Sequence, residues 1–383
     1  MAFTTHLKLP AGFENAPNIL ALGGELKSSI CQLADGEAHL SPVLGDLEQA
    51  HVYRDFIAQV EMAFQSSAPA HLVIDRHPDY LSSQWGEKLA QQHKLQLHAV
   101  QHHYAHIAAV MADNQLPINT DPVLGFALDG LGFGDDGTIW GGEVLLADYH
   151  GYRRLACFQP VAMIGGAAAI HEPWRNTMAH LLPVWDQVTA QFGDVDIVQY
   201  LADKPVAMLA KMVEQGLNAP VASSCGRLFD AVAAALGLYR DCVEFEAQAA
   251  ISLEQLATIC FEDVCEPYAI VLGQGACRIL NWQPMWLEIL ADIQQGVPPA
   301  HIAARFHHTL ILALTHVAIA IREEHDFRVI ALSGGVFQNR LISTYLPKVL
   351  KSQGFEVLQH QQVPAHDGGL SLGQAVIAAA QPT

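Results

Sequence analysis

His71-Leu-Val-Ile-Asp75 decides the fold, because this apolar stretch opens a unit of strand, helix, strand and helix. A short apolar run bounded by polar residues is typical of a buried strand. Helical spacing follows over 80–93, a second strand over 95–100, and another helix begins near His102. Strands and helices that alternate in this way indicate a sheet of parallel strands.

The same unit returns near the end of the chain, which indicates an internal duplication. A buried strand over 328–332 leads to a helix over 339–353 and a strand over 355–358. A polar segment that contains Asp367 then opens the last helix. Strand-like hairpin sequence precedes each unit, so we expect two α/β lobes, each a hairpin sheet continued by β-α-β-α units.

The duplication predicts an N-terminal lobe over 1–120 and a C-terminal lobe over 121–383. Residues 165–325 interrupt the second lobe, and their mostly helical spacing predicts a helical insertion over the cleft. Open α/β sheets bind ligands at the carboxyl ends of their strands. Equivalent strand ends of the two lobes would face each other, so we expect the functional site between the lobes.

The composition is that of a globular protein with a large core. Hydrophobic residues make up 51% of the 383 residues and charged residues 15%, which excludes a disordered chain. A formal charge of −19 opposes non-specific binding to nucleic acid or anionic membranes. No apolar run approaches ~20 residues, so no membrane span is expected. The N-terminus lacks a signal-peptide pattern, and seven scattered cysteines without a Cys-x-x-Cys pair indicate reduced thiols and a cytoplasmic location.

Two histidines four residues apart are the first candidate metal ligands. His102 and His106 share one helix face, and two neutral imidazoles offered together can chelate a divalent cation. Asp129 ends an apolar strand, and Asp367 occupies the place in the second unit that the histidines occupy in the first. These nitrogen and oxygen donors suit iron or zinc, with manganese or magnesium as alternatives. The other interpretation is a pair of capping or core histidines, and His103, on another face, is expected to be structural.

Two turns that contain glycine are candidate nucleotide contacts. Asp129-Gly130-Leu131-Gly132 follows a strand, and its glycines let backbone N–H groups approach phosphates. The alternative is a hairpin whose glycines only supply positive φ. Gly334-Gly335 lies in a strand-turn-helix segment that suits a nucleotide cradle but lacks the lysine of a Walker A loop. Asn339, at the start of the following helix, would contact the base or cap the helix.

Three further segments each have a functional and a structural interpretation. Arg227 and Asp230 either pair on one helix or leave Asp230 to bind a ribose hydroxyl. Arg175, which follows Glu172 at a helix start, either binds an anion or belongs only to that helix. Lys27 either reaches an anion or is simply exposed. No conspicuous cysteine–histidine pairing stands out as a nucleophile, which favours group transfer between bound partners.

The ordered set of motifs resembles the carbamoyltransferase HypF family, maturation factors of nickel–iron hydrogenases. The resemblance extends from about Asn18 to Ala380 and corresponds to the C-terminal half of the family's longer members. It implies the two-lobed Kae1-like module of the actin/Hsp70/sugar-kinase fold, and we expect this chain to begin at that module. The motifs are His102-His-Tyr-Ala-His106, Asp129-Gly-Leu-Gly-Phe-Gly134, Ile170-His-Glu-Pro-Trp-Arg175, Ser223-Ser-Cys-Gly-Arg-Leu-Phe-Asp230, Leu332-Ser-Gly-Gly-Val-Phe-Gln-Asn339 and His366-Asp367-Gly-Gly.

The resemblance also implies a reaction and its partners. In the family, a YrdC-like half makes carbamoyl-adenylate from carbamoyl phosphate and ATP. The Kae1-like half then passes the carbamoyl group to the C-terminal cysteine of HypE, where the group later becomes a cyanide ligand of iron. This chain would therefore carry out the second step, with carbamoyl-adenylate supplied by a YrdC-like domain or protein.

Carried over by position, the resemblance assigns roles to residues of this chain. It implies metal ligands at His102, His106, Asp129 and Asp367. It places the phosphates along the turn from Asp129 to Gly132 and gives catalytic roles to Asp129, Arg175 and Lys27. The other implied nucleotide contacts are Arg227, Asp230, Glu246, Gly334, Gly335 and Asn339.

The sequence departs from the family pattern at three places. The family has an acid and an arginine where this chain has alanines, isoleucine and His171 before Glu172. The glycine of the family's Glu-Gly-Glu/Gln-Ala-Ala segment is Ala247 here, and a first-lobe histidine is replaced by Val43 or Leu44. These departures concern the nucleotide pocket rather than the fold.

Three other functions fit the same motifs. A tRNA threonylcarbamoyl transferase has the same fold, although the charge of −19 and the lack of a basic, aromatic surface run oppose it. An O-carbamoyltransferase that acts on a small molecule would share the motifs, because the acceptor leaves little trace in them. A nucleotide-binding scaffold that only docks partners is the non-catalytic alternative.

Overall fold

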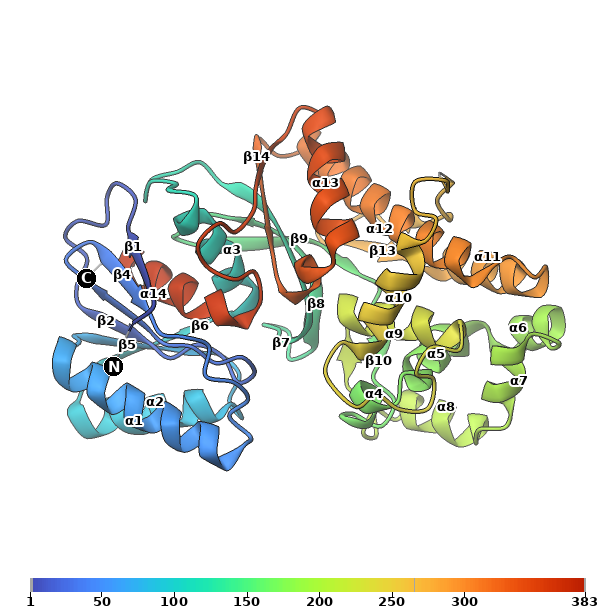
Figure 1. Ribbon diagram of the computed structural model, residues 1–383, viewed down its shortest axis with the longest axis horizontal. Coiled ribbons are helices and arrows are strands. Elements are labelled where there is room, and N and C mark those ends of the chain that lie inside the picture. The colour runs from blue at the N-terminus through green and yellow to red at the C-terminus, as the bar shows by residue number, and fades with distance from the viewer. Residues whose placement is uncertain (1–2, 265, 382–383) are drawn as a thin grey trace.

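The computed structural model describes residues 3–264 and 266–381, and its first lobe is built on a six-stranded sheet, at the left of Figure 1. The strands are β1 (Thr5–Lys8), β2 (Ile19–Ala21), β3 (Cys31–Ala34), β4 (Glu37–Leu40), β5 (His71–Asp75) and β6 (Gln96–Val100). They lie in the order β1-β4-β3-β2-β5-β6, in which β2, β5 and β6 are parallel. β3 and β4 form a hairpin that turns at Asp35 and Gly36, whose φ values of 53° and 74° are typical of a type I′ turn.

Helices cover both faces of this sheet. One face carries α1 (Ala50–Ser67) and α2 (Leu81–His93), and the other carries α3 (His102–Asp113) and α14 (Leu370–Ala380). Because side chains alternate along a strand, Leu20 and Leu72 belong to the core under α1 and α2, and Ile19 and Val73 to the core against α3 and α14. The sequence repeat did not include α1, which lies between the hairpin and β5; in the second lobe α12 occupies the corresponding place, directly before β14.

The second lobe repeats this strand arrangement in a larger sheet. Its strands are β7 (Val123–Phe133), β8 (Ile139–Ala147), β9 (Tyr152–Phe158), β12 (Val271–Leu272), β13 (Arg278–Asn281), β14 (Val329–Ser333) and β15 (Glu356–Leu358), with β10 (Val161–Ala162) and β11 (Val221–Ala222) off the main path. The order is β12-β13-β9-β8-β7-β14-β15, in which β7, β14 and β15 are parallel. The parallel triplets of the two sheets confirm the predicted duplication.

The segment 165–325 is mostly helical, as expected, but it is not a purely helical insertion. Its helices are α4 (Ala168–His171), α5 (Trp174–Leu181), α6 (Trp185–Phe192), α7 (Asp196–Ala202), α8 (Val206–Glu214), α9 (Cys225–Ala235), α10 (Gln248–Thr258), α11 (Gln283–Gln294) and α12 (Pro299–Arg322). The segment also contains β11, β12 and β13, and β13 extends the second sheet beside β9. Strands of two to four residues are too short for their alternation to be recognised in a sequence.

One helix of the described residues, α12, is long and apolar enough to cross a membrane by length and composition. Its most apolar window has a mean hydropathy of 1.3, but 72% of that window is buried inside the protein. Phe306, Leu310 and Leu314 belong to the main core of the second lobe. α12 is therefore a core helix.

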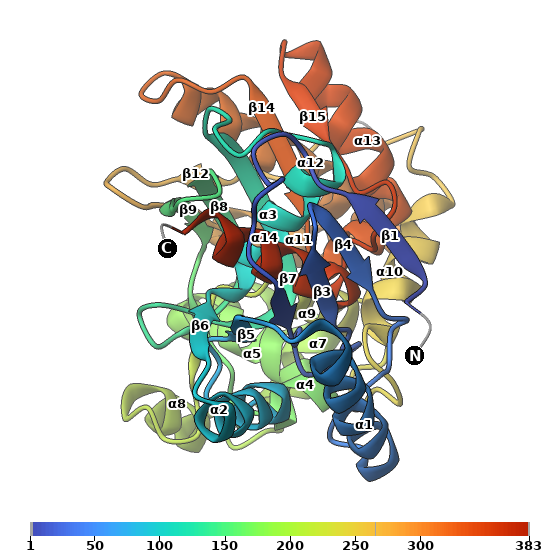
Figure 2. The same ribbon diagram turned by 90° about the vertical axis from the view of Figure 1, so that its left-hand side faces the viewer.

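The elements that end each repeat unit meet between the two sheets. α13 (Arg340–Ser352) and β15 lead through the short 3-10 turn η3 (Asp367–Gly369) into α14, which packs against α3 (Figure 2). The two helices approach so closely that a Cβ at Gly373 would lie 1.8 Å from the carbonyl oxygen of Ala105. The last helix of the chain thus lies on the first sheet. The division into lobes 1–120 and 121–383 stays a prediction.

A candidate metal and nucleotide site between the lobes

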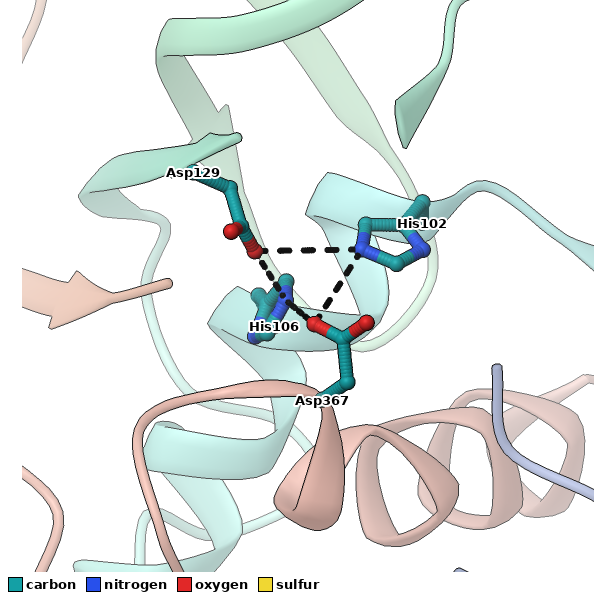
Figure 3. A group of neighbouring side chains, drawn as sticks. All are labelled: His102, His106, Asp129 and Asp367. Atoms are coloured by element: carbon teal, nitrogen blue, oxygen red, sulfur yellow. Dashed lines mark ion pairs between the residues drawn. The ribbon is translucent and has the colours of Figure 1, made fainter. Parts of the chain in front are cut away.

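Four side chains from three parts of the chain point toward one another where the lobes meet (Figure 3). His102 and His106 come from the first two turns of α3, whose start is fixed by Gln101: its side chain accepts a hydrogen bond from the first turn. Asp129 comes from β7 and Asp367 from η3. One ligand atom of each of the four lies within 4.8 Å of the others.

Three of the four ligand atoms of this group are buried and have few other partners. His106 Nε2 lies 3.0 Å from Asp129 Oδ2 and 3.5 Å from Asp367 Oδ1, and His102 Nε2 lies 3.8 Å from Asp367 Oδ1. Among the described residues, His102 Nε2, His106 Nε2 and Asp129 Oδ2 have no hydrogen-bond partner of acceptable geometry. Buried polar atoms are normally satisfied, so these three atoms fit a cation held between them.

A carboxylate orients the ring of His102 from behind. Its Nδ1 lies 2.8 Å from Oδ2 of Asp75, the last residue of β5, and both side chains are fully buried. The other oxygen of Asp75 accepts a hydrogen bond from the backbone N–H of His77 at 2.8 Å. This arrangement favours the tautomer whose Nε2 lone pair faces the site, and it is usual behind histidines that bind metals.

A neutral hydroxyl, and not a carboxylate, lies directly behind the ring of His106. Its Nδ1 lies 3.2 Å from Oγ of Ser333, which ends β14, and that hydroxyl lies 2.8 Å from Nε2 of His360. Burial lowers the pKa of His360, although Asp113, 3.7 Å from its Nδ1, acts in the opposite direction. Asp113 ends α3 and accepts hydrogen bonds from the backbone of 361 and 362, so the loop after β15 is tied to α3.

The imidazoles and the carboxylates of the site shift each other's pKa values. Burial lowers the pKa of His102, but Asp75, Asp129 and Asp367 outweigh it and raise that pKa well above its usual value. The pKa of His106 is also raised, because Asp129 and Asp367 overcome the effect of burial. In turn, the two imidazoles hold the pKa of Asp129 well below its usual range against burial. Without a cation, the site therefore holds protons that a cation must displace.

A cavity opens directly beside Asp129. Glycine turns and the start of α9 form one side of it: a Cβ at Gly335 would lie 3.0 Å from Asp129 Oδ1, and one at Gly226 would lie 3.0 Å from Gly130 Cα. Charged and apolar side chains form the rest. The lining residues are Lys27, Asp129, Gly130, Gly226, Arg227, Phe229, Asp230, Glu246, Ala247, Ala250, Ile251, Glu254, Gly335, Val336, Gln338 and Asn339.

Most of the residues predicted to contact the nucleotide line this cavity. Lys27 Nζ pairs with Glu246 Oε2 at 2.5 Å, which joins the first lobe to the segment before α10. Arg227 and Asp230 form a buried ion pair of 2.6 Å on α9, so the predicted pairing is present on the cavity wall. The predicted nucleotide contacts that reach the cavity are Asp129, Gly130, Arg227, Asp230, Glu246, Gly335 and Asn339.

Asn339 caps a helix and also lies on the cavity wall. Its side-chain oxygen accepts a hydrogen bond of 3.1 Å from the backbone of Ile342 and so caps α13. Its amide nitrogen lies 3.0 Å from Nε2 of His307, and the residue also lines the cavity. A capping role and a place beside the nucleotide are therefore compatible.

The structure does not place four of the predicted site residues on the cavity wall. Arg175 Nε donates to Glu172 Oε2 at 2.9 Å, so the helix-start interpretation describes its contacts. Leu131 packs in a small apolar cluster, and a Cβ at Gly132 would lie 2.4 Å from the His103 ring. Gly334, with a φ of 105°, lies against the backbone of β7 instead of the cavity.

Comparison with known proteins gives the family. Residues 14–113 match the family model described as the HypF Kae1-like domain, and residues 125–374 match that of the carbamoyltransferase Kae1-like domain, second subdomain. The chain belongs to the HypF carbamoyltransferase family. The resemblance read from the motifs is thereby confirmed.

Curated relatives of this HypF-family chain differ in length. The carbamoyltransferase HypF of Rhodobacter capsulatus is 38% identical over 382 residues, which are 98% of this chain and 48% of that protein. The carbamoyltransferase HypF homolog of Cupriavidus necator is 38% identical over 386 residues, 98% of this chain and 94% of that protein. The chain thus spans about half the length of the first relative and nearly all of the second.

Solved structures of HypF proteins share the fold. Full-length HypF in the phosphate- and nucleotide-bound form matches with a TM-score of 0.87 at 33% identity, over 97% of this chain and 47% of that chain. T. kodakarensis HypF matches with a TM-score of 0.84 at 30% identity, over 98% of this chain and 49% of that chain. The two-lobed Kae1-like architecture predicted from the sequence is confirmed.

Two departures from the HypF pattern lie beside the site. Val43 packs on Gly368, next to Asp367, where an added Cβ would lie 2.7 Å from Val43 Cγ2. Ala247 lines the cavity with a φ of 62°, in the left-handed region that favours glycine. This chain therefore holds an alanine in a conformation that a glycine adopts without strain.

Sequence reasoning missed the residues that hold the two histidines. Asp75 was recognised only as the end of a strand, and Ser333, His360 and Asp113 were assigned no role. A signal for Asp75 was available, because β5 and β6 are adjacent parallel strands whose carboxyl ends meet at one edge. His102 follows β6 by two residues, so an acid at the end of β5 is expected to lie near it.

Proposed function

We propose that this chain transfers a carbamoyl group from carbamoyl-adenylate to the C-terminal cysteine of a HypE-like partner, with a divalent cation at the four-ligand group. One observation carries the proposal: Asp129 belongs both to the cluster of potential ligands and to the cavity wall. A phosphate bound near Gly130 would then adjoin the cation. The homologous full-length HypF was solved with phosphate and nucleotide bound, which supports a nucleotide in this cavity.

The residues fit a bound cation of a particular kind. Two imidazole nitrogens and two carboxylate oxygens suit iron or zinc better than a thiolate-seeking metal, and manganese is a third candidate. Such a cation supplies positive charge that neutralises the α-phosphate and makes AMP a better leaving group. His102, His106, Asp129 and Asp367 would hold it.

The chain's own residues would bind and orient the adenylate. Gly130, with open space around its Cβ position, and Gly335 would leave bare backbone beside the place where phosphates lie. Asp230, fixed by Arg227, is positioned to accept a ribose hydroxyl, and Asn339 to contact the base. Lys27 brings a positive charge from the first lobe to the same cavity.

In the proposed reaction, the acceptor thiolate attacks the carbamoyl carbon. A sulfur–carbon bond forms, the bond from that carbon to the phosphate oxygen breaks, and AMP leaves with the electron pair. The roles of the chain are to hold the mixed anhydride still and to stabilise negative charge on the departing phosphate. A YrdC-like domain or protein as the source of carbamoyl-adenylate, and a cytoplasmic location, belong to the same proposal.

The test is a reconstituted transfer. The chain is mixed with a YrdC-like protein, carbamoyl phosphate, ATP and a HypE-like protein, and the acceptor is digested and analysed by mass spectrometry. We expect the carbamoyl mass on the C-terminal cysteine peptide, and none when that cysteine is replaced by serine. A second reaction without this chain controls for direct transfer from carbamoyl-adenylate.

Two results would redirect the proposal. Carbamoylation of a tRNA or of a small hydroxyl compound, but not of the thiol, would favour one of the other transferases of this fold. Nucleotide binding without any release of AMP in the presence of the acceptor would favour a scaffold.

A further inference from the structure

Two cysteines lie together on neighbouring strands of the second sheet. Cys157 is in β9, and Cys277 directly precedes β13, which runs parallel to β9 with Ile279 opposite Cys157. Cys277 and Ile279 are two residues apart and so point to the same face of the sheet. The two sulfur atoms are 3.9 Å apart. Cys157 is buried, whereas Cys277 is partly exposed.

A fixed positive charge lies near both sulfur atoms. Arg154, three residues before Cys157, donates to Glu143 Oε2 at 2.7 Å and to Asp136 Oδ2 at 3.0 Å, and its guanidinium stacks on the Trp140 ring at 4.1 Å. These contacts hold the guanidinium in place. The hydrogen bond between the two thiols, aided by Arg154, lowers the pKa of the Cys277 thiol to about 7, although burial, Glu143 and Asp136 act in the opposite direction. The pKa of Cys157 moves upward, because of its bond to Cys277 and its burial.

We propose that Cys157 and Cys277 form a redox-modification site that closes reversibly to a disulfide. The oxidants that it takes are hydroperoxides and small disulfides such as oxidised glutathione. Cys277 is the exposed attacking sulfur, and Cys157, behind it, is the resolving one. The site does not depend on carbamoyl transfer.

The reaction with hydrogen peroxide balances in two steps. The Cys277 thiolate attacks one peroxide oxygen, the O–O bond breaks, and the other oxygen leaves as water after taking a proton, so that Cys277 becomes a sulfenic acid. The Cys157 thiol then attacks that sulfur, and its proton leaves with the sulfenic hydroxyl as a second water. The two sulfur atoms have lost two electrons to the peroxide, and one S–S bond has formed.

The turn before Cys277 can allow the movement that forming this disulfide bond requires. A disulfide bond is about 2.05 Å long, so the sulfur atoms must come closer than the observed 3.9 Å. Cys277 follows a turn with Gly273 and Gly275, and Gly275 has a φ of 125° with open space around its Cβ position. β13 is also near the edge of the sheet, with only β12 outside it. The exposed side of the pair is therefore the side that is free to shift.

The test uses the intact chain. Reduced protein is treated with hydrogen peroxide or with oxidised glutathione, its remaining thiols are alkylated, and its peptides are mapped by mass spectrometry without reduction. We expect a cross-link between the Cys157 and Cys277 peptides as the main disulfide, reversed by dithiothreitol. Alkylation of Cys277 in the untreated protein should proceed readily near pH 7, because Cys157 and Arg154 lower the pKa of its thiol.

Matched variants distinguish a specific disulfide between Cys157 and Cys277 from non-specific oxidation of exposed thiols. Cys242 is exposed, so Cys242→Ser tests whether any accessible thiol gives the same product, and the cross-link should persist in it. In Cys157→Ser the cross-link should disappear, and Cys277 should be trapped as a sulfenic acid or a glutathione adduct. The proposal is wrong if Cys277 stays fully alkylatable after oxidation, or if its disulfide partners are distributed among the other cysteines.

Discussion

The imidazole ligands and the carboxylate ligands of the proposed metal site differ in how firmly the fold holds them. The side chains of His102 and His106 are 0% and 1% exposed, and each ring has a hydrogen-bond partner behind it. Asp129 and Asp367 are 14% and 15% exposed, and Asp129 also lines the cavity. The histidines therefore form a rigid half of the site, while the carboxylates can adjust to the cation and its neighbouring ligand.

The imidazole and carboxylate ligands differ in this way although His102, His106 and Asp367 come from equivalent positions of the two repeat units. α3 begins directly after β6, so its histidines are fixed by a helix, whereas Asp367 follows β15 at the end of a longer loop. α3 and α14 nevertheless pack side by side. The two units thus contribute different chemistry from equivalent positions: one gives buried nitrogen donors and the other a less buried oxygen donor.

The largest loss of metal affinity is expected when one of the two buried histidine ligands is removed. His106→Ala should weaken the binding of zinc or iron(II) to the metal-free chain by more than about 100-fold, because even the loss of a residue behind a ligand costs up to about 100-fold. Metal content and affinity would be measured by elemental analysis and by competition with a chelator. The structure predicts this loss because Nε2 of His106 is 3.0 Å from Asp129 and 3.5 Å from Asp367.

His103→Ala is the matched control for this prediction. His103 is on the same turn of α3, equally buried, and outside the ligand group. Both substitutions leave a similar cavity, so a loss of affinity in both variants would show damage to α3 and not the loss of a ligand.

A smaller effect is expected from the carboxylate behind His102. Asp75→Asn keeps the shape of the side chain but removes the charge 2.8 Å from Nδ1, so metal affinity should fall by about 10- to 100-fold. Calorimetric titration of the metal-free chain would measure it. Unchanged affinity would mean that the imidazole half does not need its buried acid, and the comparison between a rigid and an adaptable half would fail.

The third test measures how metal affinity depends on pH, and it needs no substitution. In the metal-free chain burial lowers the pKa of both histidines, but the surrounding carboxylates raise it above the usual value of about 6.5. A cation must displace those protons, so affinity should rise with pH above about 6.5, by about 10-fold per unit for each proton released, and level off above the raised pKa. The stability of the metal-free fold should change in the opposite direction, because the charged histidines stabilise it below about pH 6.5 and lose this effect as pH rises through the raised pKa.

Titrations in buffers of different ionisation enthalpy would count the protons released. A metal affinity that is flat between about pH 6 and pH 8 would contradict a site built on protonated, buried imidazoles.

The fold was predictable because the signals that carry it are local and occur twice. Apolar runs over 71–75 and 328–332 gave the strands of both units, and they agree with β5 and β14 within a residue. α1 was not recognised as part of the repeat, because its counterpart α12 lies at the end of the long inserted segment, and β13 is only four residues long. Elements whose pattern is short, or whose counterpart is far along the chain, were the ones missed.

The same reasoning explains which parts of the site could be predicted. The histidine spacing and the strand-end acids gave all four members of the ligand group, because helix periodicity and sheet topology bring them together. Ser333 and His360 could not be found in this way, because their role depends on where β14 and the loop after β15 pass behind α3. Arg175 was proposed from its charge and from the family motif, and the structure pairs it with the nearby Glu172.

The smallest expected effect concerns the uncharged support of His106. Ser333→Ala removes a hydroxyl 3.2 Å from Nδ1 of His106 and 2.8 Å from His360 without opening a large cavity. A neutral hydrogen bond contributes about 0.5–1.5 kcal/mol, so metal affinity should fall by about 3- to 10-fold, less than in Asp75→Asn. Ser371→Ala is a control, because Ser371 is also fully buried and hydrogen-bonded but outside the ligand group. If Ser333→Ala costs as much as Asp75→Asn, the two histidines are held equally, and charge behind His102 is not what distinguishes them.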